Sequence, residues 1–211
     1  MEQALINACK NNQLSVVRLL VTKKLDLNYR DNFGKTALVY AGLKGNIDII
    51  RLLVDAGADA SICDDFSNSL LHHVVVSGNK EAIKNVLKLG CIDINARNMD
   101  GSTALLMAVD KFDKNGVEIL LRHGAKDIAN NKNQTALELA SKNGASSIVE
   151  LLLVADELVE KENASKQNQI AQKRESFVAI KCTECLAFLD LDELNSNRGE
   201  CRYCNTKYEK R

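Results

Sequence analysis

A pattern that recurs about every 33 residues constrains the fold of this 211-residue chain more than any other feature. Four segments share one order of residue types: a polar turn, a Ser or Thr, a small residue with Leu, an apolar stretch, a polar break and a second apolar stretch. The residues that mark the register are Thr36, Ser69, Thr103 and Thr135. A period of this length is typical of solenoids, in which each unit packs on its neighbours. We therefore expect a stack of short helical repeats.

The N-terminal segment carries the same pattern without its leading turn. One period before Thr36 lies Gln3, which is followed by ALINACKNNQLSVVRLL. This segment brings the prediction to five repeats, of which the first and the last are degenerate. Their predicted bounds are about 1–30, 31–63, 64–97, 98–129 and 130–156.

Each repeat is predicted to be a pair of helices joined by a tight turn. The Ser or Thr is expected to be the N-cap of the first helix, because its side-chain oxygen can accept a free backbone N–H. The apolar residues that share one face of this helix should lie in the core. They are Leu38, Leu71, Leu105, Leu137, Ala41, Val74, Ala108 and Ala140. Gly45, Gly78 and Gly144 should end the first helix, because glycine tolerates the positive φ of such a turn.

The openings of the repeats, TALV, SLLH, TALL and TALE, and the GAD that follows a second helix at Gly57 resemble the ankyrin-repeat family over residues 1–156. The family's usual opening is TPLH. Pro is missing from all four openings, and only His72 keeps the imidazole. The resemblance implies a mainly α-helical, helix-pair solenoid that is not an enzyme and that binds proteins as an adaptor or scaffold. An irregular helical bundle is the alternative fold.

The same resemblance implies where a partner would bind. Ankyrin repeats usually bind through a concave surface made by the hairpin tips and the first helices. The residues at the family's variable positions that we predict to contact a partner are Phe33, Lys35, Leu43, Phe66, Val76 and Met99. Other residues at these positions are Asn32, Lys44, Asp65, Asn68, Ser77, Asp100, Ser102, Asp110 and Lys111. The alternative is that Phe33 and Phe66 pack against the next hairpin.

The histidines and the scattered cysteines are predicted to be structural. His72 occupies the family's capping position, where an imidazole bonds the neighbouring loop, and His73 should pack between repeats. Neither has a nearby nucleophile and orienting residue in the sequence, so we predict no catalytic residue. The thiols expected to be buried and inert are those of Cys9, Cys63 and Cys91.

Four further cysteines form two pairs near the C-terminus. Cys182 and Cys185 are separated by two residues, as are Cys201 and Cys204, and 15 residues lie between the pairs. Two such pairs point four thiolates at one centre, which predicts one structural Zn²⁺ with no open coordination position. A segment of about 35 residues buries too little surface to fold without such a constraint. The alternative interpretation is a dithiol redox motif. Such a motif would need a thioredoxin-like βαβ unit, and the sequence has none.

The segment around these cysteines resembles a zinc ribbon over residues 176–211, with short strands expected at 177–180 and 186–189. Residues 157–175 are predicted to be a charged helical linker. The function of the ribbon stays open between two alternatives. One is nucleic-acid binding through Arg198, Arg202, Lys207 and Lys210. The other is a role as a ubiquitin-pathway adaptor or ligase, although the segment lacks the eight ligands of a RING domain.

Charge and composition restrict the partner classes. The chain has 28 basic and 28 acidic residues, so it lacks the basic excess of a dedicated nucleic-acid binder, which argues against nucleic acid as a partner. No apolar run approaches the ~20 residues that span a bilayer. The N-terminal residues MEQALINACKNNQ lack the features of a signal peptide, which predicts a reducing compartment, the cytoplasm or the nucleus. No small-molecule substrate is predicted.

Overall fold

The computed structural model describes residues 1–155, 198–200 and 207–209. The chain divides into two compact units, Met1–Glu157 and Leu158–Arg211. The predicted linker at 157–175 and the predicted strands at 177–180 and 186–189 lie outside the described residues.

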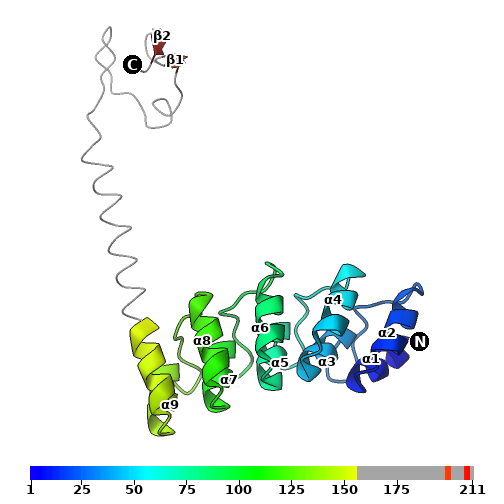
Figure 1. Ribbon diagram of the computed structural model, residues 1–211, viewed down its shortest axis with the longest axis horizontal. Helices are drawn as coiled ribbons and strands as arrows, with labels where there is room; N and C mark the ends of the chain where they lie inside the picture. Colours follow the sequence, from blue (N-terminus) through cyan, green and yellow to red (C-terminus); the bar gives the residue numbers. More distant parts are fainter. Residues whose placement is uncertain (156–197, 201–206, 210–211) are drawn as a thin grey trace. The chain divides into compact units, whose positions relative to one another are not determined.

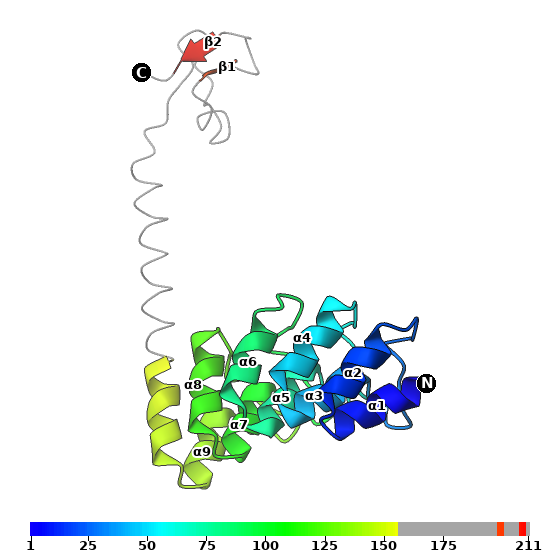
Figure 2. The same cartoon turned by 45° about the vertical axis from the view of Figure 1, so that its right-hand side comes forward.

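The first unit is a row of helix pairs (Figure 1). Its labelled helices are α1 (Glu2–Lys10), α2 (Leu14–Val21), α3 (Ala37–Lys44), α4 (Ile47–Asp55), α5 (Leu70–Ser77), α6 (Lys80–Leu87), α7 (Ala104–Asp110), α8 (Lys114–Arg122) and α9 (Ala136–Lys142). Residues 146–155 are also helical and pair with α9. Figure 2 shows the odd-numbered helices in one row and the even-numbered helices in a second row, and we call them the inner and the outer helices. The mainly helical prediction is confirmed.

Side-chain capping starts the inner helices as predicted. The hydroxyls of Thr36, Thr103 and Thr135 accept the backbone N–H three residues later at 3.3, 3.3 and 3.2 Å. The third repeat uses a variant of this cap. The backbone N–H of Ser69 donates to Nδ1 of His72 at 3.1 Å, so the imidazole satisfies the helix end.

The turns between paired helices require a positive φ. Gly45, Gly78 and Gly144 have φ of 60°, 68° and 70°, as the sequence predicts. The same register position holds Asn12, with φ 57°, and Phe112, with φ 54°. Positive φ is well tolerated by Asn but is unusual for a bulky side chain, so Phe112 is an outlier.

The core lies between neighbouring repeats. Leu38, Leu71 and Leu105 are at most 2% exposed, and the small residues three positions later are also buried. Leu137 is only half-buried, because no further repeat in the described part of the chain packs on it. The predicted core is therefore confirmed except at its C-terminal end.

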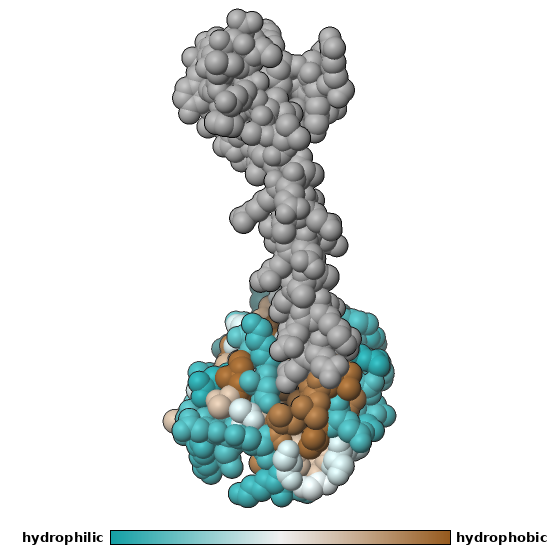
Figure 3. Space-filling view, turned by 90° about the vertical axis from the view of Figure 1, so that its left-hand side faces the viewer, coloured by the Kyte–Doolittle hydropathy of each residue, from teal (hydrophilic) through white to brown (hydrophobic). Residues whose placement is uncertain are grey.

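The C-terminal end of this stack is apolar in part (Figure 3). Leu153 and Val154 are about half exposed there. A shallow depression of about 300 Å³ is lined by Ala140, Ser141, Gly144, Ala145, Ser146, Val149 and Glu150. Apart from the hydroxyls of Ser141 and Ser146 and the carboxylate of Glu150, its lining is small or apolar.

The described residues of the second unit form a pair of antiparallel strands, β1 (Arg198–Glu200) and β2 (Lys207–Glu209). Arg198 pairs with Glu209, Gly199 with Tyr208 and Glu200 with Lys207.

Candidate protein-binding surface

Each hairpin turn is built around an Asp or Asn side chain. Oδ1 of Asp31 accepts the backbone N–H of Phe33 and of Lys35, both at 3.0 Å. Oδ1 of Asp64 accepts those of Phe66 and Asn68 at 3.0 and 2.8 Å, and Asn98 does the same in the fourth repeat. These local hydrogen bonds fix the turn, and the side chain at its tip takes no part in them.

Successive tips are joined by backbone hydrogen bonds. The N–H of Asp65 donates to the carbonyl of Phe33 at 3.2 Å, and that of Met99 donates to the carbonyl of Phe66 at 2.9 Å. Arg30 reinforces the first junction, because its guanidinium bonds the carbonyl of Gly34 at 3.1 Å and the carboxylate of Asp65 at 2.9 Å. The tips of the second, third and fourth repeats are therefore held side by side by hydrogen bonds between their hairpins.

Three large apolar side chains are exposed on these tips. Phe33, Phe66 and Met99 are 59%, 56% and 62% exposed, and we call them the tip patch. The remaining part of the Phe33 and Phe66 side chains is covered, so partial packing of these rings against the next hairpin stays an alternative. Val76 is 38% exposed at the end of α5, and Leu43 is half-buried at the same register of α3. Lys35 is half-buried beside the tip of the second repeat.

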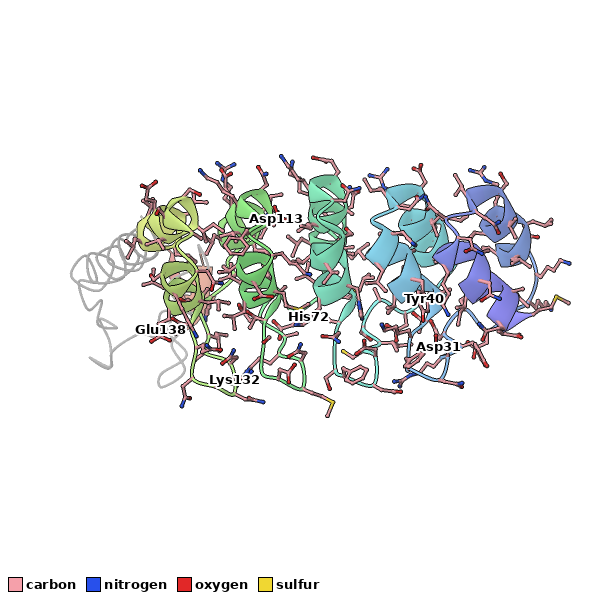
Figure 4. The ribbon with its side chains drawn as sticks, turned by 90° about the horizontal axis from the view of Figure 1, so that it is seen from below. Asp31, Tyr40, His72, Asp113, Lys132 and Glu138 are labelled. Atoms are coloured by element: carbon pink, nitrogen blue, oxygen red, sulfur yellow. The ribbon has the colours of Figure 1, made fainter. Side chains whose placement is uncertain are left out.

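The side chains of Tyr40 and Asp31 lie close together beside the hairpin of the second repeat (Figure 4). The hydroxyl of Tyr40 donates to Oδ2 of Asp31 at 2.6 Å, and Nζ of Lys10 lies 3.6 Å from the same oxygen and 4.3 Å from the Tyr40 ring centroid. Burial by itself would raise the pKa of Asp31, but hydrogen bonds from Tyr40 and the turn amides outweigh it and lower that pKa. Burial and the Asp31 carboxylate raise the pKa of Tyr40.

Two histidines support the third repeat. Nε2 of His73 lies 3.0 Å from Oδ2 of Asp64, which is a buried hydrogen bond. Nδ1 of His72 accepts the Ser69 amide, so its proton is on Nε2, which donates to the Ser102 carbonyl at 3.0 Å. Burial lowers the pKa of both imidazoles, and the carboxylate of Asp64 opposes this shift only in part. Burial would raise the pKa of Asp64, but bonds from Asn68 and the charge of His73 lower it.

Comparison with known proteins decides the family. A family model described as ankyrin repeats (three copies) matches residues 1–64, 44–131 and 71–167, which is most of the chain. The chain belongs to the ankyrin-repeat family. A search of curated proteins finds no significant match. Ankyrin-repeat proteins are typically non-enzymatic modules that bind other proteins, so the chain is expected to have a protein partner.

Within this ankyrin stack, the prediction for His72 is confirmed, because its imidazole joins its own helix cap to the loop of the next repeat. Sequence reasoning missed the pairs Asp31–Tyr40 and Asp64–His73. The available signal was a spacing: in both repeats an Asp opens the hairpin and a polar side chain follows nine residues later. The fourth repeat has Asn98 and Met107 at these positions, and the Met107 side chain has no N–H or O–H to donate to Asn98.

The thiols of the ankyrin unit differ in exposure. Cys9 is fully buried, which raises its pKa to about 12, and Cys63 is half-buried. Cys91 is exposed in the loop after α6, so the prediction of burial was wrong there. The loop follows Gly90 and leaves the helix pair before the next hairpin begins, so no neighbouring repeat covers its side chain.

The predicted metal ligands Cys182, Cys185, Cys201 and Cys204 lie outside the described residues. The described residues contain no group of three or more potential metal ligands. Of the helices that the structure describes, none combines the length and the apolar character needed to span a membrane.

Proposed function

We propose that this ankyrin-repeat chain is a protein-interaction adaptor or scaffold that binds a partner through its concave surface, made by the hairpin tips and the inner helices. The tip patch is the observation that carries the proposal. Phe33, Phe66 and Met99 are each more than half exposed on adjacent, hydrogen-bonded tips. Aromatic residues and Met are enriched in the cores of interfaces, and a contiguous exposed apolar patch marks an interaction site.

The rigidity of the tips favours binding. Ordering of loops and side chains on association opposes binding, so surfaces that are already ordered bind more tightly for the same contact area. The turns around Asp31 and Asp64, together with Arg30, hold Phe33 and Phe66 in place before any partner arrives. Leu43 and Val76 extend the apolar surface from the tips toward the far ends of α3 and α5.

The matched control for this proposal is a third phenylalanine. Phe112 is 57% exposed, close to the values for Phe33 and Phe66, but it lies in the turn between α7 and α8 rather than on a hairpin tip. Its replacement therefore removes a similar exposed ring from another part of the same domain.

The test is affinity capture with the intact chain, the double variant Phe33→Ala/Phe66→Ala and the control Phe112→Ala. We expect the double variant to lose partners that the intact chain and the control both retain. Its melting temperature should change little, because exposed side chains contribute little to stability. Retention of the same partners by a folded Phe33→Ala/Phe66→Ala chain would refute the proposal.

We also propose that Cys182, Cys185, Cys201 and Cys204 hold one structural Zn²⁺. The donor set supports this, because four thiolates in two closely spaced pairs suit tetrahedral zinc and leave no open position. Strands β1 and β2 flank residues 201–206, so pairing of Glu200 with Lys207 holds together the ends of the segment that contains Cys201 and Cys204. Cysteines that bind zinc rather than form disulfides suit a reducing compartment, and we propose the cytoplasm or the nucleus.

Metal analysis of the purified full chain tests the zinc proposal. We expect one equivalent of zinc per chain, and a large loss of zinc in the double variant Cys182→Ser/Cys185→Ser. The control is Cys9→Ser/Cys91→Ser, which changes two thiols of the ankyrin unit and should retain the metal. A chain that is purified without zinc and takes up none on addition would contradict the proposal.

A further inference from the structure

The concave surface carries cations that have no carboxylate partner. They lie beside the hairpin tips and at the far ends of the inner helices: Lys35, Lys44, Lys111, Lys132 and Lys142. In the part of the chain that the structure describes, the ion pairs within 4.0 Å involve other residues. Lys132 projects from the tip of the last hairpin (Figure 4).

The carboxylates of the same surface are paired with cations mainly in the second repeat. Asp31 is paired with Lys10, and Asp65 is paired with Arg30. Asp64 is hydrogen-bonded to His73, whose lowered pKa leaves the imidazole uncharged at neutral pH. The exposed carboxylates of this surface that are in no ion pair among the described residues are Asp100, Asp110 and Glu138. Free positive charge is therefore concentrated in the second repeat, which carries Lys35 and Lys44.

Stabilisation of helix C-termini explains only some of these lysines. Lys44 and Lys142 lie in the last turns of α3 and α9, where a cation stabilises the helix dipole. Lys35 and Lys132 lie on hairpins, outside any helix, so this explanation does not apply to them. Lys35 follows Phe33 by two residues in the same hairpin and is half-buried.

We infer that the partner is recognised through an extended acidic segment, in which carboxylates flank apolar anchor residues. The inference rests on the proposed function and specifies its partner. The apolar anchors contact Phe33, Phe66 and Met99, and the carboxylates meet Lys35 and Lys44 on one side and Lys132 on the other. Exposed ion pairs add little affinity each, but complementary charge speeds encounter and sets register. A basic segment is rejected by the same cations.

The test begins with a phage-displayed library of random peptides selected on the intact full-length chain, after depletion on the folded variant Phe33→Ala/Phe66→Ala. Depletion removes peptides that bind elsewhere, so the survivors require the tip patch. We expect the enriched peptides to combine apolar residues with a net negative charge.

The outcomes separate the two proposals. Enriched peptides that are neutral or basic would overturn the acidic-segment inference and leave the concave surface as the binding site. No enrichment after depletion would count against the proposed function and the inference together.

Charge removal then tests the lysines directly. The affinity of an enriched peptide should fall about threefold to tenfold in Lys35→Gln/Lys44→Gln at low salt. The matched control is Lys80→Gln/Lys88→Gln, which removes the same charge from the outer helix α6 and its C-cap and should leave the affinity unchanged. The difference between the two variants should shrink at about 500 mM NaCl because salt screens exposed charges. Equal effects of both variants would overturn the inference.

Discussion

At the scale of single residues, the N-cap side chains of the outer helices differ in whether they have an N–H that can bond the preceding repeat. Oδ1 of Asn46 and of Asn79 caps α4 and α6, respectively. Nδ2 of each donates to the preceding repeat, to Oδ1 of Asn12 at 2.6 Å and to the carbonyl of Gly45 at 2.8 Å. Asp113 caps α8 through Oδ1, but its Oδ2 is buried without a hydrogen-bond partner. A carboxylate cannot supply the donor that both asparagines supply.

We predict that Asp113→Asn stabilises the stack. The new carboxamide keeps the cap through its oxygen and removes the buried carboxylate oxygen that lies over Gly116 without a hydrogen-bond partner. The free energy of unfolding should rise by about 1 kcal/mol, because a buried oxygen without a partner destabilises the fold by about this much or more. Urea denaturation followed by circular dichroism measures the change. The converse variant Asn79→Asp should lose a similar amount, and a loss of stability in Asp113→Asn would show that this account is wrong.

A second residue-scale prediction concerns Phe112, whose backbone has φ 54° where three other repeats have Gly. The left-handed region costs a residue with a Cβ about 1–2 kcal/mol. We therefore expect Phe112→Gly to raise the free energy of unfolding by about 1 kcal/mol. Gly78→Ala is the converse control. No atom lies within 4 Å of the added Cβ, so any decrease in its free energy of unfolding comes from the backbone conformation alone. A destabilised Phe112→Gly would mean that the ring contributes packing that outweighs the strain.

At the scale of elements, helix α5 and its hairpin contain the titratable groups that respond near neutral pH. Burial lowers the pKa of His72 and His73 from the ordinary value of 6.5, so below that pH the unfolded chain binds more protons than the folded chain. Stability is therefore complete above about pH 6.5 and is lost as the pH falls below it, by at most about 1.4 kcal/mol per pH unit for each histidine. The carboxyls of Asp31 and Asp64 have lowered pKa values and add a further loss only at more acidic pH.

We predict that the free energy of unfolding falls between about pH 7.5 and about pH 5.5. The fall should be much smaller in the double variant His72→Gln/His73→Gln, which has no imidazole to protonate in this repeat. His123→Gln, at an exposed histidine, is the control, and its free energy of unfolding should fall as much as that of the intact chain. Denaturation curves at the two pH values provide the comparison. An unchanged pH dependence in the double variant would contradict the assignment to this histidine pair.

The elements also show what sequence reasoning can and cannot predict. The period of the pattern predicted the register, and register alone places Thr36, Thr103 and Thr135 as caps and Leu71 and Leu105 in the core. Contacts between repeats depend on which side chains meet across a junction, and no single repeat contains that information. The hydrogen bond from Arg30 to Asp65 joins two repeats, so neither repeat alone predicts it.

At the scale of the ankyrin unit, function depends on neighbouring repeats acting together. Each repeat contacts mainly its neighbours, as in other solenoids, and contributes one hairpin tip to a common surface. One tip alone exposes a single large apolar side chain, which is common on protein surfaces. Phe33, Phe66 and Met99 become a candidate interface because backbone bonds hold three consecutive tips in line.

The central claim, that partners bind this line of tips, is tested most directly by hydrogen–deuterium exchange of the intact chain with and without a partner captured by it. The account predicts slower exchange on binding in the hairpins around residues 31–36, 64–69 and 98–103, with no change in the outer helices α4, α6 and α8. Protection confined to the outer helices, with unchanged exchange in these hairpins, would contradict it.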